Sequence, residues 1–145
     1  MEGKFIPGDS IKNKSKYLRV LFTFKDGSIL NFDDSRCFGW LAIKDKKDYL
    51  KVLPLSKIGV EPIDPKINVN EVYQEIHKSH RSIKETLLDQ TIVSGLGNIY
   101  VDETLFRAHI SPLSKANLLS KSDVANILKH AKDVLIMAIK HNGTT

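Results

Sequence analysis

A short stretch in the second half of this sequence carries side chains that could bind a phosphate group. The run Gly95-Leu96-Gly97-Asn98 separates two apolar segments, and Lys84 lies upstream of it together with His80 and Arg81. Two glycines allow a tight backbone turn, and Asn98 is predicted to cap the helix that follows. The free N–H groups and the positive dipole end of such a helix suit an anion. The same pattern also fits an ordinary connection between two helices, so the spacing alone leaves both interpretations open.

The elements that position this stretch are predicted to be helices. Apolar side chains recur at helical spacing from Val69 to Ile76, around Leu87 and Leu88, and from Val124 to Ala138. Each apolar stripe has a polar pair spaced as an N-cap and its partner: Asn68 with Glu71, Ser82 with Glu85, and Ser120 with Asp123. The last helix is predicted to close near Gly143. The second half is therefore expected to be a small helical domain.

The first half has the period of strands. YLRVLFTF, which starts at Tyr17, alternates apolar and polar residues, and KDGS then supplies a turn before ILNF. This pattern predicts a β-hairpin, and CFGWLAI, from Cys37 to Ile43, is predicted to be a further strand. The proline-rich run Glu61–Lys66 interrupts the pattern. We therefore expect two domains, residues 1–64 and residues 65–145, in an α+β chain.

The composition restricts the compartment and the partner. The 145 residues include 22 Lys and Arg against 17 Asp and Glu, a formal net charge of +5, which favours an anionic partner such as nucleic acid. The single cysteine, Cys37, excludes an internal disulfide and a zinc site of the usual multi-cysteine kind. No apolar run approaches the roughly 20 residues that cross a bilayer, and the first residues lack the order of a signal peptide. We expect a soluble, cytoplasmic protein with no membrane partner.

A long motif around the glycine turn resembles a known DNA-repair family. The stretch from Ile83 to Phe106, IKETLLDQTIVSGLGNIYVDETLF, is similar to the helix–two-turns–helix motif of bacterial formamidopyrimidine-DNA glycosylases, with the pattern IK-x-x-LLDQ-x-x-x-x-GLGNIY-x-x-E-x-LF. The following HISPLSKANLLS and the final NGTT resemble the next loop and the start of the base-capping loop of that family. The resemblance implies that Lys84 and Asn98 contact DNA phosphates beside a lesion.

The first half resembles the same family more loosely. Met1-Glu2-Gly3-Lys4 is similar to a segment whose methionine enters the duplex and whose next residue lines the damaged-base pocket, which carries these roles to Met1 and Glu2. DSRCFG, which ends at Gly39, resembles the family loop D-x-R-x-FG, whose arginine and phenylalanine fill the void left by an everted base. This carries the void-filling role to Arg36 and Phe38. The plain alternative for Phe38 is packing in the sheet core. Cys37 departs from the basic residue that the family often has there.

The resemblance also implies an activity. Members of this family act in base-excision repair, where they excise oxidised purines such as 8-oxoguanine and formamidopyrimidines and cleave the strand as AP lyases. Their nucleophile is an N-terminal proline amine followed by a glutamate, and a four-cysteine finger at the C-terminus holds zinc. Neither has a counterpart in this sequence, so we expect no catalytic residue, metal or cofactor in this chain and no activity from it alone. Zinc is expected only in the full-length family protein.

The expected architecture is the trailing part of an antiparallel β-sandwich domain followed by a helix–two-turns–helix domain. A monomer is expected to bind double-stranded DNA containing oxidised bases across the cleft between the domains, in association with the nucleoid. One alternative is the related endonuclease VIII class, which acts on oxidised pyrimidines; the Met1 and Arg36-x-Phe38 pattern argues against it. Another is a non-catalytic nucleic-acid-binding module, because ribosomal proteins also use such a motif; the strand-rich half with DSRCFG disfavours it.

Overall fold

The computed structural model describes residues 3–8 and 15–143, and two of the predicted site residues, Met1 and Glu2, lie outside this part. The chain forms two compact units, Met1–Lys46 and Lys47–Thr145. The first contains a three-stranded sheet and the second contains the helices, so the α+β class is confirmed.

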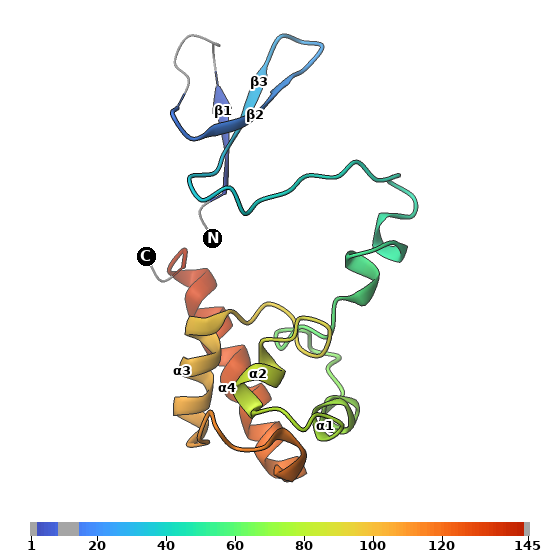
Figure 1. Ribbon diagram of the computed structural model, residues 1–145, viewed down its shortest axis with the longest axis vertical. Helices are drawn as coiled ribbons and strands as arrows, with labels where there is room; N and C mark the ends of the chain where they lie inside the picture. Colours follow the sequence, from blue (N-terminus) through green and yellow to red (C-terminus); the bar gives the residue numbers. More distant parts are fainter. Residues whose placement is uncertain (1–2, 9–14, 144–145) are drawn as a thin grey trace. The chain divides into compact units, whose positions relative to one another are not determined.

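The first unit is an antiparallel sheet with the strand order β1-β3-β2 (Figure 1). Strands β1 (Lys4–Gly8), β2 (Leu18–Thr23) and β3 (Ile29–Asp33) include the predicted hairpin, β2 and β3. Gly27 turns this hairpin with a φ of 83°, a conformation that costs glycine little because it has no Cβ. The Asp26 carboxylate accepts the Ser28 N–H at 2.9 Å and fixes the same turn. Phe32 is 8% exposed and contacts Phe5, with 5.0 Å between the ring centroids.

The strand predicted at Cys37–Ile43 is wrong. These residues have no strand assignment, and Ile43 is fully exposed in the part of the chain that the structure describes. The apolar spacing suggested a strand, but the backbone leaves the sheet after β3 in a tight loop. Cys37 adopts a φ of 57° in that loop, a left-handed conformation that a regular strand does not contain.

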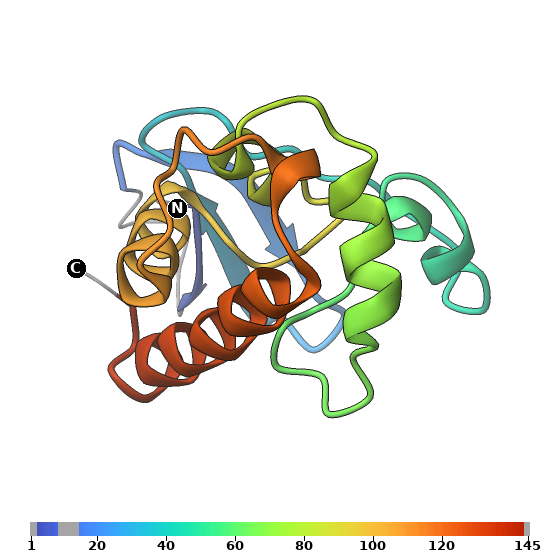
Figure 2. The ribbon, with the colours of Figure 1, turned by 90° about the horizontal axis from the view of Figure 1, so that it is seen from below.

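The second unit packs helices α1 (Val69–His77), α2 (Ile83–Leu87), α3 (Asn98–Ala108) and α4 (Lys121–Lys140) around one apolar core. Short 3-10 turns lie at η1 (Tyr49–Lys51), η2 (Leu55–Lys57) and η3 (Ala116–Leu118). Helices α3 and α4 lie side by side (Figures 1 and 2). The predicted apolar stripes supply part of this core, with Ile76, Leu87, Val124 and Ile127 at most 1% exposed. Ile83, Leu96, Val101 and Leu105, which lie outside those stripes, are equally buried.

The helix ends agree with the predicted signals at most positions. Ser82 with Glu85 and Ser120 with Asp123 form capping boxes, and the Asn68 side chain accepts the Asn70 N–H at 3.0 Å. Beyond α4, Gly143 has a φ of 106° and donates its N–H to the Ala138 carbonyl at 2.8 Å. Local sequence therefore determines where these helices begin and where the last one ends.

The segment before the proline-rich run is attached to the helical unit. Gly59 donates its N–H to the Gln90 carbonyl at 2.8 Å, and Ser94 donates to the Val60 carbonyl at 2.9 Å. A Cβ at Gly59 would lie 2.5 Å from the Ile92 carbonyl oxygen, so only glycine allows this approach. These bonds agree with the boundary of the compact units, which falls between Lys46 and Lys47 and before the proline-rich run. The assignment of residues 1–64 and 65–145 to two family domains stays a prediction.

Candidate nucleic-acid interface

Lys84 lies in the first turn of α2, on the side that faces α3. The capping box fixes the start of α2, because the Ser82 hydroxyl accepts the Glu85 N–H at 3.3 Å and the Glu85 carboxylate accepts the Ser82 N–H at 3.0 Å. The Lys84 ammonium lies 2.7 Å from one carboxylate oxygen of Asp102 and 2.9 Å from the other. Asp102 belongs to α3, so this ion pair connects the two helices of the motif.

The Lys84–Asp102 pair leaves the lysine available to another anion. The Lys84 side chain is 35% exposed and the Asp102 side chain is 52% exposed. Ion pairs at such exposure contribute only about 0–1 kcal/mol, because water and salt screen them. An external anion such as a phosphate can therefore take over the ammonium at low energetic cost, through a charge-assisted hydrogen bond.

The turn between α2 and α3 is fixed by Gln90, a residue that sequence reasoning did not single out. The Gln90 side chain accepts the Gly95 N–H at 2.9 Å and donates to the Leu96 carbonyl at 2.9 Å. An amide can do both because it carries a donor and an acceptor. Gly95 has a φ of 86°, which strains any residue with a Cβ. Gln90 lies in the LLDQ part of the motif, but its partners could not be assigned from spacing.

Helix α3 begins without a side-chain cap. Its N-cap is Gly97, and Asn98 is the first helical residue, so the prediction that Asn98 caps this helix is wrong by one position. No side chain bonds to its first turn as a cap, and that turn contains no acidic residue. Asn98 is exposed, and a Cβ at Gly97 would meet nothing within 4 Å. The positive end of the α3 dipole is therefore open to an external anion.

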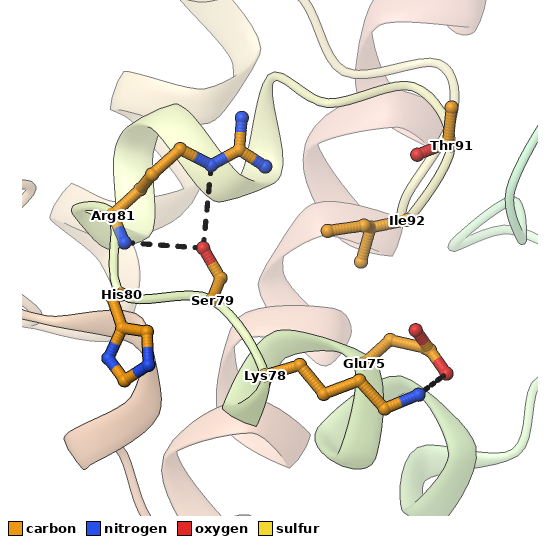
Figure 3. A pocket seen from close by; sticks show the side chains of 7 residues that line it. All are labelled: Glu75, Lys78, Ser79, His80, Arg81, Thr91 and Ile92. Atoms are coloured by element: carbon orange, nitrogen blue, oxygen red, sulfur yellow. Dashed lines mark hydrogen bonds and ion pairs between the residues drawn. The ribbon is translucent and has the colours of Figure 1, made fainter.

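A neighbouring polar pocket contains two further cations, Lys78 and Arg81. It is lined by Glu75, Lys78, Ser79, His80, Arg81, Thr91 and Ile92, and Figure 3 shows Lys78 turned to Glu75 and Arg81 bonded to Ser79. Lys78 pairs with Glu75 at 2.6 Å, and the Arg81 guanidinium pairs with Asp89 at 2.8 Å. The bond from Arg81 is the main reason that the pKa of Asp89 falls to about 2. Lys78 and Arg81 are thus each paired with a carboxylate, as Lys84 is with Asp102.

The loop that follows β3 presents Arg36 and Phe38. Phe38 is 76% exposed, and the Arg36 guanidinium carbon lies 4.8 Å from the centre of its ring. This exposure contradicts packing of Phe38 in the sheet core, the plain alternative. Within the first unit, the two side chains border a hollow that is lined by Gly3, Phe5, Phe32, Asp34, Arg36, Phe38, Gly39, Trp40 and Leu41. An exposed aromatic beside a guanidinium is suited to stack on a base and to donate hydrogen bonds to its edge.

In residues 3–8 and 15–143, no helix combines the length and the apolar character that a bilayer span needs. In the same residues, His, Cys, Asp and Glu side chains do not gather in groups of three that could hold a metal ion. The zinc expected for the full-length family thus has no fitting ligand set among them.

Comparison with known proteins identifies the family. Residues 58–145 match the model described as the formamidopyrimidine-DNA glycosylase H2TH domain. The formamidopyrimidine-DNA glycosylase of Exiguobacterium sibiricum is 42% identical over 146 residues, which cover 100% of this chain and 53% of that protein. The chain therefore belongs to the formamidopyrimidine-DNA glycosylase family, as the motif around the glycine turn predicted.

Two solved structures with DNA have the same fold. The Lactococcus lactis formamidopyrimidine-DNA glycosylase, non-covalently bound to DNA with an AP site, has a TM-score of 0.88 and 33% identity over 99% of this chain and 55% of that one. A MutM complex with DNA containing carbocyclic 8-oxo-G has a TM-score of 0.88 and 33% identity over 99% of this chain and 54% of that one. The chain spans about half the length of these relatives.

Proposed function

We propose that this chain supplies the duplex-binding part of a base-excision repair enzyme that acts on oxidised purines in DNA. The observation that carries this proposal is the uncapped start of α3, together with the part-exposed Lys84 whose ammonium pairs with Asp102 of the same helix, inside the segment that matches the family model. The two features place a positive dipole end and a cation within one helix–turn–helix segment. The DNA complexes of the relatives support a duplex with a damaged or missing base as the partner.

In this proposal the four described site residues have two tasks. Lys84 and the first turn of α3 at Asn98 bind backbone phosphates, which carry little sequence information and so fix position. Arg36 and Phe38 enter the duplex where a base has left the stack, and they offset part of the few kcal/mol that eversion costs. Met1 and Glu2, which lie outside the described residues, are proposed to add a further wedge and to line the base pocket.

The chemistry is proposed for the whole protein. A secondary amine attacks the sugar carbon of the everted nucleotide, the base leaves, and a Schiff base forms before the strand is cleaved by elimination. The residues described here contribute binding and distortion of the duplex to that reaction. We further propose that the protein binds as a monomer and works in the cytoplasm, at the nucleoid.

The test is a binding titration with two duplexes of one sequence, one intact and one with a tetrahydrofuran abasic analogue opposite cytosine. We expect tighter binding to the analogue duplex, with affinity for both duplexes falling as salt rises because phosphate contacts release counterions. A chain that folds but binds both duplexes equally, or neither, would contradict the proposed function. Replacing the cytosine by other bases measures the preference for the opposite base that Arg36 is proposed to create.

A further inference from the structure

One carboxylate holds the loop that carries Arg36 and Phe38. Asp34, the residue after β3, is 3% exposed. Its Oδ1 accepts the Arg36 N–H at 3.1 Å, and its Oδ2 accepts the Gly39 N–H at 2.7 Å. The two oxygens thus bind the backbone at the start of the loop and just beyond Phe38, so both exposed side chains project from a segment whose two ends share one anchor.

The anchor is itself attached to the sheet. Asp34 donates its N–H to the Tyr17 carbonyl at 2.9 Å, and its carbonyl accepts the Arg19 guanidinium N–H at 2.8 Å. Tyr17 is the residue before β2, and Arg19 is the second residue of β2. The position of the carboxylate is therefore fixed relative to the β2–β3 hairpin. Movement of the loop relative to the sheet would therefore break several part-buried hydrogen bonds.

The backbone between the two bonds has a shape that few residues fit. Cys37 adopts a φ of 57°, and a Cβ on Gly39 would lie 2.9 Å from the Phe32 ring and 3.0 Å from Asp34 Oδ2. The close approach of Gly39 allows its N–H to reach the carboxylate. The N–H of Gly39 is also the main cause that lowers the pKa of Asp34, so the charged form is the one that the loop stabilises.

We propose that Asp34 is a positioning residue, whose carboxylate holds Arg36 and Phe38 in the projecting arrangement that recognises a duplex with a missing or everted base. This inference rests on the proposed function and deepens it. An amide cannot replace the carboxylate, because asparagine has one acceptor oxygen while both loop N–H groups need an acceptor. Asp34→Asn therefore keeps the size of the side chain, breaks one of the two bonds and weakens the other, because a neutral amide oxygen is a weaker acceptor than a carboxylate oxygen.

The matched control is Asp26→Asn in the same sheet. Asp26 accepts the N–H two residues ahead, as Asp34 does, but it lies in the β2–β3 turn and makes no bond to the loop at Arg36. Three chains are compared: the original, Asp34→Asn and Asp26→Asn. Two quantities are measured: hydrogen exchange of the Gly39 amide without DNA, and the ratio of the dissociation constants for the intact duplex and the tetrahydrofuran duplex.

We expect Asp34→Asn to speed exchange at Gly39 and to lower the ratio about tenfold, while affinity for the intact duplex stays the same. Asp26→Asn should change neither quantity. The only tryptophan, Trp40, follows Gly39 and gives an additional fluorescence signal of the loop. A general loss of structure would weaken binding to the intact duplex as well. It is therefore distinguished from the expected result, in which only the ratio of the two dissociation constants changes.

The two proposals fail in different ways. If the original chain shows no preference for the tetrahydrofuran duplex, the proposed function fails, and the Gly39 exchange still decides whether Asp34 fixes the loop. Unchanged exchange in Asp34→Asn overturns the positioning role. Faster exchange with an unchanged ratio overturns it as well, because the loop geometry would then have no part in recognition.

Discussion

Helices α3 and α4 pack against each other but begin in opposite ways. In α4 the Ser120 hydroxyl accepts the Asp123 N–H at 3.1 Å and the Asp123 carboxylate accepts the Ser120 N–H at 2.9 Å. In α3 the N-cap is Gly97, which has no side chain, and the first turn contains no acid. A capped start satisfies its own N–H groups, whereas an uncapped start leaves them for a ligand.

This difference separates stability from binding. The cap of α4 holds the scaffold in place, and its removal should weaken the fold without changing how DNA is bound. The start of α3 gives up that stabilisation and leaves its dipole end free for a phosphate. The following predictions test the separation, beginning with the largest effect.

Giving α3 a charged cap should have the largest effect on binding. Gly97 has a φ of −97° and a ψ of 179°, which any residue adopts, and a Cβ there would meet nothing within 4 Å. Gly97→Asp should therefore raise stability by a few tenths of a kcal/mol, yet weaken DNA binding by about tenfold, ~1.4 kcal/mol, because a carboxylate would occupy the phosphate position. Gly97→Ser, a neutral cap, is the control and should weaken binding less. Equal affinity of Gly97→Asp and the original chain would show that no phosphate binds there.

Removal of the motif lysine should weaken binding to every duplex. Lys84→Ala is expected to lower affinity for intact and damaged DNA alike and to make the slope of log K against log salt shallower by about 0.9, the value for one phosphate contact. Lys78→Ala is the matched control, because Lys78 precedes the motif in the sequence and, like Lys84, forms an exposed ion pair, with Glu75 at 2.6 Å. Filter binding across a salt series measures both slopes. An identical change in the two variants would rule out a specific contact by Lys84.

Removal of a cap should affect stability alone. Ser120→Ala deletes the hydroxyl that accepts the Asp123 N–H, and we expect a loss of about 1 kcal/mol in the free energy of unfolding. Urea denaturation measures this loss, and DNA affinity under native conditions should stay unchanged. Ser122→Ala, which removes a hydroxyl near the same helix start but no cap, should cost less. A clear loss of DNA affinity in folded Ser120→Ala would contradict the claim that the start of α4 contributes only to stability.

The smallest expected effect is the pH dependence of that cap. The Ser120 hydroxyl is the main cause that lowers the pKa of Asp123 below its ordinary value of 3.8. A depressed carboxylate pKa stabilises the fold above the ordinary value, and this contribution is lost as pH falls through the folded-state pKa. The stability difference between the original chain and Ser120→Ala should therefore shrink at pH values below 3.8. Denaturation midpoints across an acid series test this, and a constant difference would exclude the ionised carboxylate as the source.

Local signals predicted much of the fold. The capping pairs at Ser82 and Ser120 act within four residues, so sequence spacing alone located both helix starts. The apolar stripes likewise predicted the core, because helical period and burial are linked. The family was found from one uninterrupted motif, whose length made a chance match improbable.

The errors arose where distant or single atoms decide the structure. Cys37–Ile43 has the apolar content of a strand, but the Asp34 carboxylate turns the chain away from the sheet. Asn98 was predicted to be the N-cap of α3, but it is the first helical residue. Gly97 is the N-cap, although it makes no side-chain hydrogen bond. The roles of Gln90 and Asp34 depend on specific backbone N–H groups several residues away, and periodicity contains no information about such partners.

The Gln90 bridge has a consequence for the entropy of the proposed DNA binding. Its side chain holds the N–H of Gly95 and the carbonyl of Leu96, and its own carbonyl accepts the N–H of Gly59. The turn is thus ordered before any ligand arrives. Fixing one residue of backbone costs about 1–2 kcal/mol in conformational entropy, and here that cost falls on folding. A phosphate that reaches the start of α3 meets a preorganised surface, which leaves more of the contact energy for affinity.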